Sequence, residues 1–207
     1  EFRRVLFRSG AAAGVAPSTE VDYGVVKGLQ LHAFMPLAFN RPAGQGAQWG
    51  PGDFEIGAKF RIDGHLDDDR ALAVALEPFV DFPTGDADRG LGTGHTHAFL
   101  PIWVSKQLEG DWKPFAGGDY WINPGAGNRN WGFFGAGLSK TLDAYGLVLG
   151  GEVFHATAST DGGKDATGFD VGGTYEIAEN RYLMLTVGRG LQNADSTNRA
   201  SLLVGFQ

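Results

Sequence analysis

The sequence has no cysteine among its 207 residues. This absence excludes a disulfide framework and any cysteine-based metal site. There is also no uninterrupted apolar run near the roughly 18 residues of a transmembrane helix. A helical membrane protein is therefore excluded. A β-barrel is not, because barrel strands alternate in polarity and give only a weak hydropathy signal.

The sequence also has no excess of basic residues. The chain has 17 Lys and Arg against 24 Asp and Glu, which gives a formal net charge of −7. Since Lys and Arg supply most of the affinity for phosphate backbones, we expect no nucleic-acid partner. Glycine, by contrast, is abundant, because 33 glycines are more than twice the usual share of about 7%. Such a composition indicates β-structure with many turns.

Apolar and polar residues alternate with a period of two along most of the chain. In the stretch "FEIGAKFR", Phe54, Ile56 and Phe60 share one face, and Glu55 and Lys59 share the other. Each alternating segment has about the 9 to 11 residues of a tilted strand that crosses a bilayer. About eleven such segments are present, at 19–26, 29–38, 53–61, 71–82, 96–106, 112–122, 131–141, 146–157, 167–177, 181–191 and 199–207.

The connections between these segments alternate in length. Short or medium turns, such as Lys27-Gly28 and "DGHLDDD", are followed by long loops such as "NRPAGQGAQWGPGD" and "PTGDADRGLGTGH". Outer-membrane barrels place short turns on the periplasmic side and longer loops outside. The pattern predicts an all-β fold, an antiparallel up-and-down transmembrane β-barrel in the bacterial outer membrane. We expect loops 39–52 and 83–95 to fold inward and narrow it.

Residues 1–9, "EFRRVLFRS", match one reading frame of the end of a widely used short-read sequencing adapter without a mismatch. We interpret them as a translated artefact and exclude them from the fold. Residues 10–207 then form a single barrel domain that lacks its signal peptide and N-terminal strand, with 10–18 in an external loop. Eleven strands plus one missing strand give an even twelve, as in bacterial barrels. If residues 4–7 pair as a strand, we expect opportunistic pairing with an open edge.

The apolar face can point in either direction in such a barrel. A soluble barrel buries it in a core, but eleven strands are too many for an interior filled by side chains. We therefore expect the apolar face to meet lipid and the charged face to line a wet lumen. These charges would either select polar solutes or pair with one another. The lumen-lining candidates are Asp22, Glu55, Lys59, Arg61, Glu77, Asp81, Lys113, Asp119, Glu152, Asp170, Glu176 and Arg199.

Aromatic residues near the strand ends predict two interfacial girdles. These residues are Trp112, Tyr145 and Tyr182 after short turns, and Phe82, Tyr120, Trp121 and Trp131 beside long loops. Prolines add a local constraint, because a proline cannot donate to a strand ladder. Pro36 and Pro83 are expected at strand ends. Pro78, Pro101 and Pro114 fall inside predicted strands, where bulges or ladder breaks are expected.

Two groups of residues suggest chemistry other than that of a simple pore. His95 and His97, with Asp86 and Asp88 in the same loop, have the ligand types of a surface metal site, but polar residues also suit a solvated barrel rim. A Ser-His enzyme would use His155 with Ser159, since Ser139 and His32 lie elsewhere, but there is no nucleophile-elbow sequence. We expect no metal, no cofactor and no catalytic residue.

The stretches "FEIGAKFRI" and "ALAVALEPFVDFPTGDADRGLGTG" resemble the MetA-pathway of phenol degradation family of transporter-like outer-membrane barrels. The most characteristic elements are Pro83-Thr84-Gly85-Asp86 and Gly90-Leu91-Gly92-Thr93-Gly94. The resemblance runs from about residue 19 over most of the chain, and it implies uptake of small, often aromatic compounds without catalytic residues. The chain departs from the pattern at its start and at Gln207, which follows the aromatic Phe206.

The sequence thus predicts a passive channel or uptake pore for small molecules, including aromatic or hydrophobic ones. Expected partners are outer-membrane lipid, lipopolysaccharide and a small-molecule solute. The sequence does not indicate an oligomeric state. The alternatives are an outer-membrane lipid-modifying enzyme, a purely structural barrel and, third, a soluble binding barrel.

Overall fold

A computed structural model of the chain describes residues 5–8, 11–63, 65–68 and 70–206. Within them the chain forms one antiparallel sheet of fourteen strands and two 3-10 helices of three residues each. No helix among the described residues is long and apolar enough to cross a membrane. The strands are β1 (Val5–Arg8), β2 (Ala11–Val26), β3 (Leu29–Arg41), β4 (Gln48–Pro51), β5 (Phe54–Arg61), β6 (Leu72–Leu76), β7 (Phe79–Phe82), β8 (His97–Lys106), β9 (Trp112–Ile122), β10 (Trp131–Leu142), β11 (Leu147–Ala156), β12 (Ala166–Ala178), β13 (Arg181–Gln192) and β14 (Ala200–Phe206).

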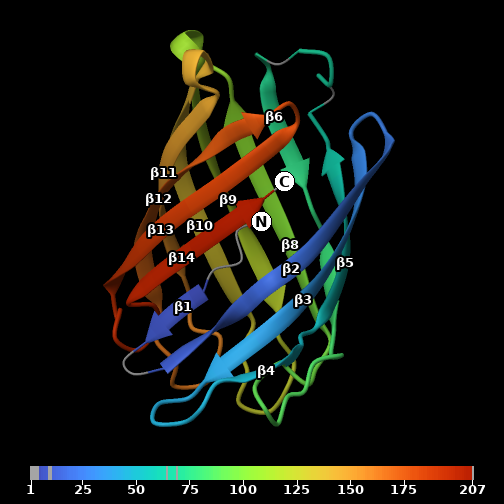
Figure 1. Cartoon of the computed structure of the whole chain (residues 1–207). Coiled ribbons are helices and arrows are strands. Elements are labelled where there is room, and N and C mark those ends of the chain that lie inside the picture. Colours follow the sequence, from blue (N-terminus) through green and yellow to red (C-terminus); the bar gives the residue numbers. More distant parts are fainter. Residues whose placement is uncertain (1–4, 9–10, 64, 69, 207) are drawn as a thin grey trace.

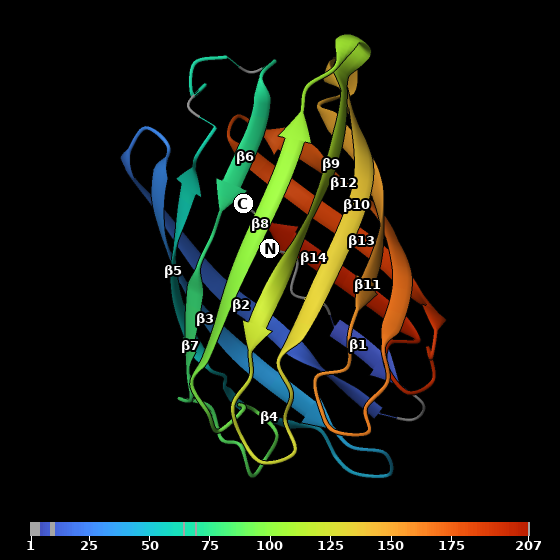
Figure 2. The same ribbon diagram turned by 180° about the vertical axis from the view of Figure 1, so that it is seen from behind.

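The strand pairings close into a ring. Consecutive strands pair from β8 to β14, and β14 continues through β1 and β2 to β3. β3 pairs with β4 and β5, which follow one another along it, and β6 and β7 lie end to end between β5 and β8. The described strands therefore occupy twelve positions around a barrel wall (Figures 1 and 2). The predicted antiparallel barrel is confirmed.

Exposed apolar side chains lie on the outer face of the barrel, as predicted, in the strands whose side chains the structure describes. On β5, the Glu55 side chain is fully buried whereas its neighbour Ile56 is 42% exposed. On β3, Phe34 is buried and Met35 is 65% exposed. Because successive side chains of a strand point to opposite faces, these differences place Glu55 and Phe34 on the inner face and the exposed apolar residues Ile56 and Met35 on the outer face.

The predicted strands match the observed ones except in two places. The stretch 39–52, which was predicted to be an inward-folded loop, contains the end of β3 and the strand β4 that pairs with it, and the N-terminal side also differs. β2 begins at Ala11, so the expectation that residues 10–18 form an external loop was wrong for the described part of that stretch. β3 extends to Arg41, and β2 pairs with it from Ala12 onward. The backbone N–H and C=O groups of this part of β2 need hydrogen-bond partners, and β3 runs alongside it. A β-bulge between Val15 and Ser18 shifts the register without ending the pairing of the two strands.

β1 lies where the twelfth strand was expected. Val5 and Phe7 pair with Leu202 and Ala200 of β14, and the other edge of β1 pairs with the start of β2. The pairing expected for residues 4–7 is thus present at residues 5–7, while residues 1–4 lie outside the described part of the chain. β1 fills the gap between β14 and β2 with four residues only.

The prolines differ in their effect on the hydrogen bonds between neighbouring strands. Pro78 separates β6 from β7, which confirms the predicted break, and Pro101 of β8 lies opposite the same break. At Pro114 there is no bulge, but the β8–β9 ladder ends at the adjacent pair of Ser105 and Phe115 although both strands continue, so a ladder break lies beside this proline. Pro36 lies inside β3 rather than at its end, opposite the β2 bulge.

The tight turns lie at one end of the barrel together with the longer connection 62–71 between β5 and β6, and the other loops gather at the opposite end (Figure 1). Two of the long loops are bound together by Asp53. Its carboxylate accepts hydrogen bonds from the Gly85 and Thr93 backbone amides at 2.9 and 2.7 Å and from Thr93 Oγ1 at 2.7 Å. Gly85 and Gly92 approach so closely that a Cβ on Gly85 would lie 2.9 Å from the Gly92 Cα. This contact explains the glycines of the "PTGD" and "GLG" elements.

Candidate solute path through the barrel

Aromatic rings form a stripe on the inner face of the barrel. Phe79 stacks on Phe99 with ring centroids 4.8 Å apart, and Phe99 stacks on Trp121 at 3.8 Å. The contacts continue to Trp131 at 4.9 Å, and the His32 ring meets Phe79 edge-on at 4.8 Å. Phe133, on the same face of β10 as Trp131, stacks on Phe154 at 5.6 Å. We call this set the aromatic stripe, and it consists of His32, Phe79, Phe99, Trp121, Trp131, Phe133 and Phe154.

Part of the predicted girdle belongs to this stripe instead. Trp121 and Trp131 were expected at the lipid interface, but they face inward, where they stack on each other. Tyr120 is exposed on the outer face, so its neighbour Trp121 must point to the inner one. Tyr182 likewise alternates with the exposed Leu183. Trp112, Tyr145, Phe82 and Tyr120 remain as exposed aromatic residues near strand ends.

A buried histidine lies among carboxylates at one end of the stripe. His32 Nε2 is 3.0 Å from Glu55 Oε1, and its Nδ1 is 3.2 Å from Asp22 Oδ1 and 3.4 Å from Glu20 Oε1. Glu20, Asp22 and His32 place one ligand-type atom each within 4.8 Å of one another. The sequence showed no sign of this cluster, because Glu20 and His32 come from facing strands whose register it did not fix.

Several predicted lumen residues lie on the inner face with identified partners. Asp81 and Asp170 are buried, and the Ser201 hydroxyl hydrogen-bonds to Asp170 Oδ1 at 3.1 Å. The indole N–H of Trp103 donates to Asp119 Oδ1 at 3.1 Å. Glu152 is half-buried directly opposite Asp170 in the β11–β12 register. The carboxylates therefore concentrate on the inner wall away from the short turns.

Three of the predicted basic residues, Lys59, Arg61 and Lys113, lie closer to the short turns, whereas Arg199 lies at the long-loop end. Lys59 pairs with Glu77 at 3.1 Å, and the Arg61 guanidinium binds Asp63 through two hydrogen bonds of 2.8 and 3.0 Å. Lys113 and Glu176 are exposed near the ends of their strands. Arg199 precedes β14 and pairs with Asp195 of the adjoining loop at 2.9 Å.

The residues considered for metal binding and for hydrolysis do not assemble. His97 is buried opposite Asp81 on β7, whereas His95 is exposed in the loop. His155 Nδ1 lies 2.9 Å from Thr167 Oγ1, and the backbone oxygen of Ser159 accepts hydrogen bonds from the loop 123–130.

No protein-family model matches the sequence, and no curated protein matches it. Solved structures do match. The COG4313 outer membrane channel from Pseudomonas putida F1 is 16% identical with a TM-score of 0.68, covering 99% of this chain and 89% of that one. The NanC porin is 13% identical with a TM-score of 0.58, covering 99% of this chain and 96% of that one. The chain thus has the fold of an outer-membrane channel.

Proposed function

We propose that this protein is a passive channel of the bacterial outer membrane through which small molecules pass. The observation that carries the proposal is the closed barrel with an apolar outer face and an inner face of carboxylates, bases and aromatic rings. An apolar outer band is stable in lipid, and a charged inner face is stable beside water. The likeness in fold to a channel and a porin supports the same function.

We infer that the predicted lumen residues line the solute path, with Glu55, Asp81 and Asp170 as its most buried carboxylates. The outer face would contact lipid, with lipopolysaccharide around the long loops. Residues 1–9 remain, in this proposal, an adapter artefact, of which residues 5–8 pair with β14 and β2. The stacked rings of Phe79, Phe99, Trp121 and Trp131 give part of the inner face an apolar and aromatic character, which favours small solutes with an aromatic or apolar part.

Membership of the MetA-pathway of phenol degradation family is part of the proposal. It is supported by the two motifs that carry the resemblance, since the Asp53 carboxylate binds Gly85 of one motif and Thr93 of the other. The two motifs thus form one structural unit at the long-loop end.

Conductance in planar lipid bilayers tests the proposal. The purified chain, checked for heat-modifiable migration on electrophoresis, is expected to give discrete conductance steps in potassium chloride. Trp131→Ala, which removes a ring from the aromatic stripe, is expected to enlarge the steps, whereas Tyr145→Ala, exposed outside the barrel, is expected to leave them unchanged. A folded barrel in the membrane without conductance would contradict the channel and favour a structural barrel.

A further inference from the structure

Three side chains of the types that bind metals meet on the inner wall where β2 pairs with β3. Asp22 lies directly opposite His32 in the register of the two strands, and Glu20 is two residues from Asp22 on the same face. Among the described residues, these three are the one group of histidine and carboxylate side chains whose ligand atoms all come within 4.8 Å of one another. The pairing of the strands therefore brings one nitrogen ligand and two oxygen ligands together.

The distances around the imidazole suit ligands of a single ion. His32 Nδ1 is 3.2 Å from Asp22 Oδ1 and 3.4 Å from Glu20 Oε1. Imidazole and carboxylate ligands lie about 2.0–2.2 Å from a zinc ion, so neighbouring ligands of a tetrahedral or octahedral site are roughly 2.8–3.6 Å apart. Both distances fall in this range. The imidazole nitrogen is thus at the distance from each carboxylate that two ligands of one ion have.

The other nitrogen of the ring is held by Glu55. This side chain is fully buried, and its Oε1 lies 3.0 Å from His32 Nε2. An N–H at Nε2 that donates to Glu55 leaves the lone pair of Nδ1 directed at Asp22 and Glu20. Metal-bound histidines typically donate their other N–H to a carboxylate in this way, which orients the ring. A lone pair that faces two carboxylates requires a cation between them, either a proton on Nδ1 or a metal ion.

The cluster is open to the lumen on its carboxylate side. The side chain of His32 is 3% exposed, whereas those of Asp22 and Glu20 are 35% and 40% exposed. The His32 ring also packs edge-on against Phe79 at 4.8 Å. An ion can therefore reach the carboxylates through water while the imidazole stays fixed. Water can fill the coordination positions that three protein ligands leave open.

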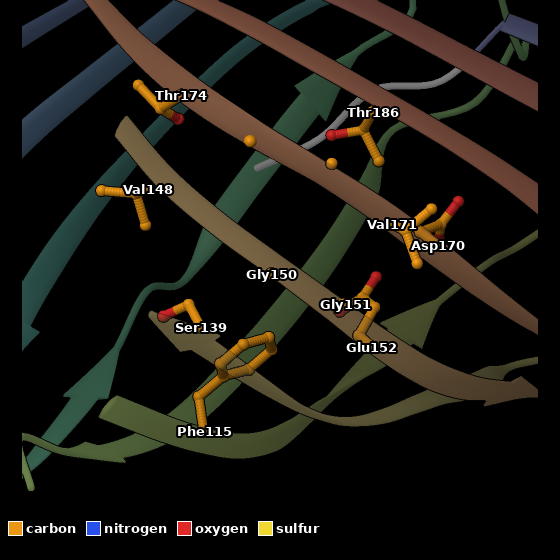
Figure 3. A pocket seen from close by; sticks show the side chains of 12 residues that line it. Phe115, Ser139, Val148, Gly150, Gly151, Glu152, Asp170, Val171, Thr174 and Thr186 are labelled. Carbon is orange, nitrogen blue, oxygen red and sulfur yellow. The ribbon is translucent and has the colours of Figure 1, made fainter. Parts of the chain in front are cut away.

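A second group of carboxylates on the inner wall has no nitrogen ligand. Glu152 and Asp170 lie together at one end of a cavity of about 250 Å³ between β9 and β13 (Figure 3). No histidine is among the described residues that line this cavity. The cavity therefore lacks the imidazole that favours a transition metal, and Glu152 offers a matched control for the carboxylates of the cluster.

We propose that Glu20, Asp22 and His32 form a binding site for one divalent transition-metal ion of the Zn²⁺ type. Imidazole combined with carboxylates suits zinc, whereas Mg²⁺ and Ca²⁺ prefer sites of oxygen ligands alone. The site lies on the wall of the proposed channel but does not depend on the passage of solutes. A metal at this position differs from the sequence-based expectation of none, which concerned the loop residues around His95 and His97.

Calorimetric titration of the whole untagged chain with zinc chloride tests the site. One Zn²⁺ per chain is expected at the tightest site, with an affinity at least about tenfold above that for Mg²⁺. Asp22→Asn and Glu20→Gln each change a ligand at an accessible position and are expected to weaken Zn²⁺ binding about tenfold or more. Glu152→Gln, the same kind of change in the cavity, is expected to bind Zn²⁺ as the unmodified chain does. Heat-modifiable migration shows that each variant is a folded barrel.

X-ray absorption at the zinc edge identifies the ligands directly. One imidazole in a shell of nitrogen and oxygen atoms about 2.0–2.2 Å from the ion is expected. The imidazole signal is expected to disappear in His32→Gln and to persist in His155→Gln, which changes a histidine that contacts Thr167 instead.

Zinc without an imidazole ligand would overturn the site, as would equal affinity for Zn²⁺ and Mg²⁺ or unchanged affinity in both Asp22→Asn and Glu20→Gln. A proton on Nδ1 of His32 would then be the cation between the carboxylates. Zinc binding without conductance would instead contradict the channel and leave the metal site intact.

Discussion

Gly57 lies on the inner face of β5 against the ring of Phe79. A Cβ at this position would lie 2.8 Å from Phe79 Cε1 and 2.8 Å from the Pro78 carbonyl oxygen. Gly57→Ala is therefore expected to lower the free energy of unfolding by about 1–3 kcal/mol, measured by urea titration in lipid vesicles. Gly24→Ala is the matched control, since nothing lies within 4 Å of its Cβ. Equal stability of the two variants would contradict the packing described for Phe79.

Asp63, in the turn after β5, is expected to make stability depend on pH. Hydrogen bonds from the Arg61 guanidinium hold the pKa of Asp63 well below its usual range. Because the folded-state pKa is depressed, its stabilising effect is complete above the unfolded value of about 3.9 and is lost as the pH falls through the folded value. The unmodified chain should thus be more stable than Asp63→Asn at pH 7, with the difference shrinking in strong acid.

The comparison is made by denaturant unfolding at a series of pH values. Asp161→Asn, an exposed carboxylate of a long loop, should match the unmodified chain at each pH. A difference between Asp63→Asn and the unmodified chain that stays constant down to the strongest acid would contradict the role given to Arg61.

At the scale of elements, the segment 42–53, which contains β4, and the loop 83–96 are expected to behave as one unit because of Asp53. Hydrogen bonds to a charged group contribute about 1.5–3 kcal/mol each. Asp53→Ala is therefore expected to speed amide exchange at Gly85 and Thr93 about tenfold or more, measured by hydrogen exchange. Asp88→Ala, exposed in the same loop, is the control and should leave both amides protected. Unchanged exchange in Asp53→Ala would mean that the loops are held by other contacts.

The strands were predictable because alternation is a local property of the sequence. In β5, Ile56 and Phe60 recur every second residue, and this spacing alone places them on one face. That the apolar face points outward was predicted from the number of strands and the lengths of the loops. The β2 extension could not be predicted in this way, since its alanines and glycines give no alternation and it forms because β3 continues alongside.

The site was less predictable than the strands. Glu152 and Asp170 were individually assigned to the inner face, but their direct opposition depends on the register of β11 and β12. The aromatic stripe was missed because Trp121 and Trp131 lie beside long loops, where interfacial girdles are also expected. A shift of one residue along a strand moves a side chain from the lipid-facing side of the barrel to the lumen-facing side.

For the whole molecule, the pairings that close the ring join distant parts of the sequence. β14 meets β1, and β5 joins both β3 and the two strands that precede β8. Each ladder therefore depends on its neighbours on both sides, and a closed barrel leaves no edge for pairing with other chains. Eleven of the twelve positions are occupied by strands predicted from the alternation, and the twelfth is occupied by β1. That residues 5–8 would fill the last position was anticipated only as opportunistic pairing.

Site-directed fluorescence quenching tests the central claim, that lipid lies outside this barrel and water inside it. The chain has no cysteine, so Val187→Cys and Thr186→Cys each provide a unique labelling site, on opposite faces of β13. In lipid vesicles, the label at position 187 should be quenched by doxyl-labelled lipid and the label at position 186 by acrylamide in water. Lipid quenching at position 186 with acrylamide quenching at position 187 would contradict the account.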